Sequence, residues 1–158
     1  MKTHSRTALS ILIALTLGAG AATAQLANKK TLTLEAARQI AAAAEKEAAG
    51  SKLTMVIAIL DDGGNLIYLE RMDETQIGSI EVAQQKARSA VSFKRPTKVF
   101  EDAVAGGRTA ILKLPGAMPV EGGLPLTVDG KIIGAIGCSG GTGAQDGQTC
   151  QAGVDAMK

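Results

Sequence analysis

The sequence has 158 residues, 46% of them hydrophobic and 2% aromatic, and its 17 Lys and Arg against 15 Asp and Glu leave a formal net charge of +2. This length suits one domain with its own core. The small charge excess and the few aromatic residues, Tyr68, Phe93 and Phe100, argue against a nucleic-acid-binding surface, which needs many cations and stacking platforms.

Residues 1–24 have the pattern of a secretory signal peptide. Two basic residues precede a short apolar run, Ala8–Leu17, and Ala22-Thr23-Ala24 is a small-x-small cleavage site. The run is too short to span a membrane easily. We therefore expect cleavage after Ala24 and export, most simply to a bacterial periplasm, of one domain formed by residues 25–158.

Cleavage at this site would change both the charge and the available ligands of the chain. It would remove Lys2 and Arg6, so that 15 cations balance 15 acids in the remaining 134 residues. It would also remove His4, the only histidine. The exported chain is therefore expected to be neutral and to lack imidazole, which excludes zinc or iron sites built on histidine.

The chain after the cleavage site predicts a helix followed by a β-hairpin. Thr33 is a suitable N-cap, and Gly50 is expected to stop the helix. Its expected buried face consists of Leu34, Ala37, Ile40, Ala41 and Ala44. The apolar run Leu53–Leu60 and residues 66–72 are strand candidates, and the turn residues Asp61–Asn65 between them predict an antiparallel hairpin.

Two helices are predicted next. Ser79 can cap a helix that runs to Phe93, with small apolar residues along one stripe. Pro96 interrupts this pattern, and Thr97–Ala105 form a short amphipathic helix. Residues 108–116 are expected to be a connecting segment.

The C-terminal third predicts a second hairpin and a last helix. We expect a short strand at Met118–Val120 and longer strands at Leu124–Val128 and Lys131–Cys138, the last two joined by an Asp129-Gly130 turn. A helix is expected to begin at or near Asp146. Tight turns between strands favour an antiparallel sheet, so the predicted class is α+β, with about five strands flanked by helices.

The second hairpin and the start of the last helix are rich in glycine, with nine in residues 121–147. A phosphate cradle would suit a loop ahead of a helix. However, the loop lacks a P-loop ending and a clean G-x-G-x-x-G motif, and Gly134 and Gly137 within a strand indicate close backbone packing. A tight turn with close packing is the stronger interpretation.

Other chemistries are weakly supported by the sequence. Asp61, Asp62 and Asp73-Glu74 could bind a hard cation, but Asp-Asp-Gly-Gly is turn chemistry first. Ser139 stands in a G-x-S-x-G match, yet no histidine follows that could serve as its base. We therefore predict no catalytic residue and assign no metal site.

Lys86 and the two cysteines each leave two interpretations open. Lys86 lies beside the apolar stripe of its helix, where it would either extend to water or reach an anion such as a ligand carboxylate. Cys138 and Cys150 flank the glycine-rich loop. They are equally consistent with a disulfide in an oxidising compartment and with two small buried apolar residues.

Three segments together resemble the GlcG/HbpS-like haem-binding family: LDDGGNLIYLERMD, GSIEVAQQKARSAVSF and GAMPVEGGLPLTVDGKIIGAIGCSGGTGAQDGQTCQAGVDAM. The resemblance extends from Leu32 to Met157. It implies a profilin-like α+β domain that assembles as a homo-oligomer and binds haem or a related tetrapyrrole. The ligand-binding residues that we expect on this basis are Lys86, Gly122, Gly123, Ser139, Gly140 and Asp146. Lys86 would meet a propionate, and the others would supply backbone and polar contacts.

The sequence departs from this family in one respect. Some relatives use histidine to ligate haem iron, and the exported chain has none. The ligand of the iron would then have to be Tyr68, Met72, Met118 or a lysine. The main hypothesis is a non-enzymatic binding protein. The alternative is an enzyme that uses Lys86 with Ser139 or Asp146 on a small hydroxy or oxo acid, or an accessory protein of a periplasmic oxidation pathway.

Overall fold

The structure is a computed structural model that describes residues 26–157, so the predicted signal peptide lies outside the described residues. The elements are α1 (Leu34–Gly50), β1 (Val56–Asp61), β2 (Leu66–Arg71), α2 (Ser79–Phe93), α3 (Lys98–Ala105), a 3₁₀ helix η1 (Thr109–Lys113), β3 (Gly123–Val128), β4 (Lys131–Ser139) and α4 (Gly143–Asp155). The α+β class is confirmed. In the described part of the chain, no helix is both long enough and apolar enough to cross a membrane.

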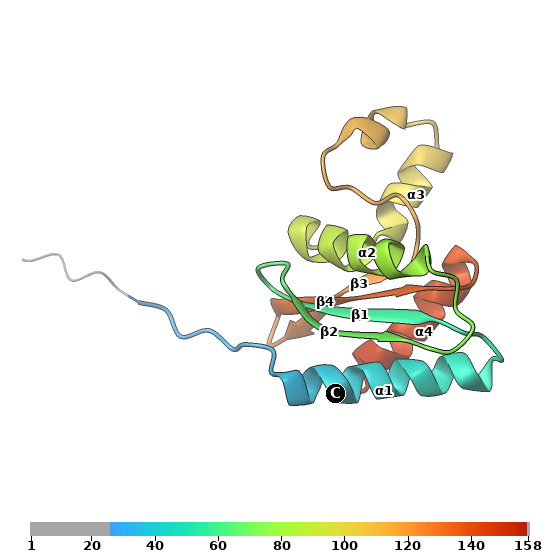
Figure 1. Ribbon diagram of the computed structural model, residues 1–158. Helices are drawn as coiled ribbons and strands as arrows, with labels where there is room; N and C mark the ends of the chain where they lie inside the picture. The colour runs from blue at the N-terminus through green and yellow to red at the C-terminus, as the bar shows by residue number, and fades with distance from the viewer. Residues whose placement is uncertain (1–25, 158) are drawn as a thin grey trace, which may run out of the picture.

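The sheet is antiparallel and has four strands in the order β2-β1-β4-β3. Helices α1 and α4 cover one face and α2 covers the other, while α3 and η1 stand above α2, away from the sheet (Figure 1). Both faces of β1 are therefore buried, because Ile57 and Ile59 pack with α1 and α4 while Val56 and Ala58 pack with α2.

The prediction of a fifth strand at Met118–Val120 is wrong. This segment runs as irregular backbone from η1 toward β3. The N–H of Met118 donates to Ser89 Oγ on α2 at 3.0 Å instead of to a neighbouring strand. Its apolar residues resemble a strand in sequence, but a side chain of α2 binds a backbone group that a strand would use for pairing.

The predicted helix start at Thr33 and the predicted hairpin turns are confirmed. The Thr33 side chain accepts a hydrogen bond from the N–H of Ala36. Leu34, the first residue of α1, is 44% exposed, so the buried face of the helix begins at Ala37 instead. Asp129 and Gly130 both have positive φ, 50° and 72°, as a two-residue turn between twisted strands requires.

Helix α2 lies very close to the sheet, and glycine makes this possible. A Cβ placed on Gly137 of β4 would come 2.0 Å from the carbonyl oxygen of Ala83, and one on Gly123 of β3 would come 2.3 Å from that of Lys86. Backbone atoms cannot yield as a flexible side chain can. The expectation of close backbone packing is confirmed, and the neighbour is this chain's own helix.

We predict that Gly137→Ala lowers the free energy of unfolding by about 3 kcal/mol, because the added methyl group forces α2 away from β4. Gly78→Ala is the matched control, since its new Cβ would meet nothing within 4 Å. Urea denaturation followed by far-UV circular dichroism measures both variants. Equal stability of the two would contradict the role given to this contact.

Candidate functional site

The structure brings the six predicted site residues together at one end of the sheet, where β3 begins and β4 ends. Lys86 reaches this point from α2, and Asp146 reaches it from the first turn of α4. The Lys86 Nζ atom lies 2.6 Å from Asp146 Oδ2 and donates to the carbonyl oxygen of Cys138 at 3.1 Å. Both side chains are almost fully buried, with 1% and 4% exposed. Lys86 therefore reaches an anion and does not extend to water. The anion is a carboxylate of the chain itself and not one of a ligand.

Asp146 accepts hydrogen bonds on both carboxylate oxygens. Its Oδ1 accepts from the N–H groups of Gly140 at 3.1 Å and Gly141 at 2.9 Å, and its Oδ2 accepts from Lys86. Burial raises the pKa of Asp146 above its ordinary value, whereas the hydrogen bonds from Lys86, Gly141 and Gly140 act in the opposite direction. An ionised carboxylate suits this arrangement, because every contact to it is a donor.

The predicted start of the last helix needs a correction of three residues. Helix α4 begins at Gly143, and Thr142 is its N-cap. Thr142 and Gln145 form reciprocal side-chain-to-backbone hydrogen bonds, which is a capping box. Asp146 consequently lies within the first turn, where a negative charge is favourable to the helix. It is also the group that fixes the glycine loop ahead of the cap.

The glycines of this region make room for the ion pair and for neighbouring backbone. A Cβ on Gly122, whose φ is +117°, would lie 2.6 Å from Asp146 Cβ and 2.9 Å from Lys86 Nζ. A Cβ on Gly140 would lie 2.1 Å from the carbonyl oxygen of Thr54. Both positions therefore need glycine for contacts inside the chain.

The structure decides the open question about the cysteines. Cys138 and Cys150 form a disulfide between β4 and α4, with Cα atoms 5.7 Å apart. Cys138 also supplies the carbonyl oxygen that Lys86 binds. A disulfide that closes a loop of this size raises the free energy of unfolding by about 3 kcal/mol, because it lowers the entropy of the unfolded chain. The disulfide and the ion pair thus hold α4 to the same end of the sheet.

Ser139 and Ser79 complete this buried region. Ser139 Oγ donates to Ser79 Oγ at 3.1 Å, and the two residues are 5% and 0% exposed. Ser79 does not cap α2 as predicted, because it is the first helical residue and Gly78 holds the N-cap position. No buried side-chain nitrogen or oxygen in residues 26–157 lacks a hydrogen-bond partner. The groups of this buried centre are therefore satisfied by one another.

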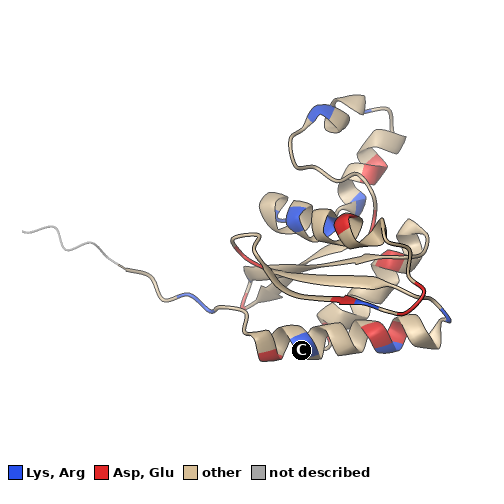
Figure 2. Ribbon diagram, in the orientation of Figure 1, with Lys and Arg blue, Asp and Glu red and all other residues tan. Residues whose placement is uncertain are grey.

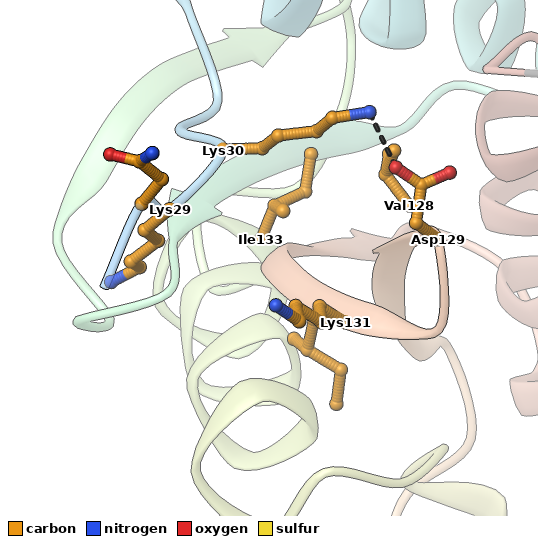
Figure 3. Close-up of a pocket in the computed structure, with 8 residues that line it drawn as sticks. Lys29, Lys30, Val128, Asp129, Lys131 and Ile133 are labelled. Atoms are coloured by element: carbon orange, nitrogen blue, oxygen red, sulfur yellow. Dashed lines mark hydrogen bonds and ion pairs between the residues drawn. The ribbon is translucent and has the colours of Figure 1, made fainter.

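An open groove lies at the other end of the β3–β4 hairpin, beside its turn. It has a volume of about 460 Å³ (Figure 3). Its lining residues are Asn28, Lys29, Lys30, Val128, Asp129, Lys131, Ile132 and Ile133. A second hollow of about 260 Å³ shares Val128 and Ile133 with the groove and extends to Met157 beside α1. The sequence alone did not indicate this groove, although Lys131 directly before Ile132-Ile133 is a signal that could have pointed to it.

The groove has an apolar floor and a cationic rim. Lys29 and Lys30, the blue stretch ahead of α1 in Figure 2, pair with the half-buried carboxylate of Asp62 and the exposed carboxylate of Asp129, respectively. Figure 3 shows Lys30 reaching across the groove to Asp129, with Lys131 on the other side of Ile133. No ion pair of Lys131 is found within the described part of the chain. The rim can therefore receive an added carboxylate.

Comparison with known proteins gives the family. The family described as "Haem degrading protein HbpS-like" matches residues 32–155. The chain belongs to the HbpS-like family. It is 43% identical to protein GlcG of Escherichia coli K12 over 112 residues, which cover 71% of this chain and 84% of that protein.

Solved structures of HbpS-like proteins share this fold. A double mutant of Streptomyces reticuli HbpS is 31% identical and superposes with a TM-score of 0.78, covering 88% of this chain and 95% of that one. A PduOC:heme complex is 30% identical with a TM-score of 0.73, covering 80% and 95%. This chain matches 37% of the length of a full corrinoid adenosyltransferase PduO from Salmonella typhimurium, so only that part is comparable.

The donors available in this HbpS-like chain suit the organic part of a haem better than its iron. Residues 26–157 contain no histidine, and both cysteines form the disulfide. In the same residues, no group of three or more His, Cys, Asp or Glu side chains could hold a metal ion. The groove, in contrast, offers apolar contact for a macrocycle and lysines for its carboxylates.

We predict that Lys86→Met lowers the free energy of unfolding by about 3–5 kcal/mol, because it leaves the Asp146 carboxylate buried without its cation. The double variant Lys86→Met/Asp146→Asn should lose less than the sum of the two single variants. Guanidinium denaturation of all four proteins gives this coupling energy.

Lys98→Met provides the matched control. Lys98 pairs with Asp102 at the same 2.6 Å separation, but both side chains are exposed. Its loss should change stability little, since solvent screens such pairs. A loss in Lys86→Met no larger than that in Lys98→Met would show that burial of the pair does not matter.

Proposed function

We propose that this member of the HbpS-like family is an exported binding protein for haem or a related tetrapyrrole and that it works as a homo-oligomer. The observation that carries the proposal is the groove, which is lined by Val128, Ile132 and Ile133 and has lysines at its rim. A tetrapyrrole of the haem type is flat and apolar with carboxylates at one edge, so it has complementary chemistry. The family match and the haem complex of PduOC support this ligand class.

The buried centre has a positioning role in this proposal. Lys86, Ser139 and Asp146 are all buried, and they bind each other, Ser79 or neighbouring backbone. Direct contact with a ligand would require Lys86 to leave Asp146 inside the protein. The same burial removes support for an enzyme that uses these three residues on a small acid. Together with Gly122, Gly123 and Gly140, they hold the end of the hairpin in place.

Ligand binding can be tested by titrating the purified protein with hemin and following the Soret band. We expect a saturable shift, and Lys131→Glu should weaken binding about tenfold, which corresponds to ~1.4 kcal/mol. The reason is that a negative charge then faces the ligand carboxylates. Lys113→Glu makes the same charge change on η1, outside the groove, and should leave the affinity unchanged. A titration without saturation would refute the proposed function, and equal effects of both variants would refute the groove as its site.

Export is supported by the signal-peptide pattern of residues 1–24 and by the disulfide, which forms most readily in an oxidising compartment. The homo-oligomer rests on membership of the HbpS-like family. We expect a native mass spectrum of the periplasmic fraction to show a chain beginning at Gln25, lighter by two hydrogen atoms and present as a multimer. Full-length protein retained in the cytoplasm would contradict export. A monomer at every concentration tested would contradict the homo-oligomer.

A further inference from the structure

The groove of this chain holds few groups that could bind an iron atom. The two thiols are bound to each other, and no histidine occurs in residues 26–157. A lysine ammonium has three donors and no lone pair, so the lysines at the rim are suited to carboxylates and not to a metal. Recognition at this groove must therefore depend on other parts of a tetrapyrrole.

The alternative ligands considered from the sequence lie elsewhere or already have partners. Tyr68 is on β2, which is separated from β3 by two strands. Its hydroxyl donates to Glu70 at 2.8 Å, and this bond raises the pKa of Tyr68, which disfavours a phenolate ligand. The Met72 sulfur accepts the N–H of Met55, and Met118 lies in the loop beside α2. None of these three lines the groove.

Met157 offers a thioether beside the groove, since it lines the adjoining hollow. In haem proteins, methionine typically acts opposite a histidine, and the described residues supply none. Met157 therefore provides apolar surface beside Val128 and Ile133. Replacing Met157 also tests whether an iron–sulfur bond makes the groove prefer the iron complex.

The rim of the groove is arranged to exchange one carboxylate for another. Lys30 and Asp129 are both largely exposed, so opening their ion pair costs about 1 kcal/mol or less. Lys131 brings a further positive charge to the same mouth. Two carboxylates of one ligand could thus be neutralised by Lys30 and Lys131 without breaking a buried interaction.

We propose that the groove recognises the macrocycle and the carboxylates of a tetrapyrrole and does not discriminate by its central metal. This inference rests on the proposed function, because it concerns the same ligand and the same groove. The metal-free dicarboxylic porphyrin and its iron complex should accordingly bind with similar affinity. Esterification of the carboxylates should weaken binding strongly, because it removes the groups that the lysines bind.

The test measures equilibrium binding of three probes to the full exported chain: hemin, metal-free protoporphyrin and the dimethyl ester of metal-free protoporphyrin. Absorption reports hemin, and porphyrin fluorescence reports the other two. We expect the first two affinities to agree within about threefold and the ester to bind at least about tenfold more weakly. Lys131→Glu should weaken hemin and metal-free protoporphyrin equally, and Met157→Leu should change neither.

The same measurements distinguish failure of this inference from failure of the proposed function. If hemin binds more than about tenfold tighter than the metal-free porphyrin, the inference is wrong, and loss of that advantage in Met157→Leu or Tyr68→Phe would identify the iron ligand. The proposed function would survive that result. If no probe binds saturably, the proposed function itself fails.

Discussion

The contact between α2 and the β3–β4 hairpin is the constraint on which the rest of the structure depends. Gly123 and Gly137 face the helix backbone at distances that no Cβ could occupy. Ala83 and Ala87 present small side chains from the helix. Because helix and sheet are so close, the side chain of Lys86 passes the end of the sheet and reaches Asp146 on the opposite layer.

The ion pair that results connects the two helical layers of the fold. A buried pair gains little net stability over apolar side chains of the same size, because both charges must lose their hydration. Its effect is on arrangement, since an unpaired lysine or aspartate at this depth is costly. Asp146 must therefore lie beneath the glycine loop, and Gly140 and Gly141 must direct their N–H groups toward it. The disulfide fixes α4 in the same position.

Local patterns in the sequence predicted the elements well, whereas contacts between distant residues could not be predicted. Thr33 and the Asp129-Gly130 turn act within a few residues, and both are confirmed. Met118–Val120 resembled a strand only because pairing partners are invisible in a single sequence. The partner of Lys86 is 60 residues away, and that of Lys30 is 99 residues away. The centre was therefore found as a set of residues without its internal pairing, and the groove was missed.

The two ends of the β3–β4 hairpin differ, because one is held by contacts within the chain and the other carries the groove that we propose as the binding site. At the open end of the hairpin, Gly123 pairs with Gly137. The buried ion pair, the disulfide and close backbone contacts fix this end to α2 and α4. At the turn, Val128 pairs with Lys131, and the same strands carry an apolar floor with exposed lysines. Since a strand is stiff along its length, fixing one end also fixes the direction of the other. The residues that the family resemblance singled out can thus determine where the groove lies without lining it.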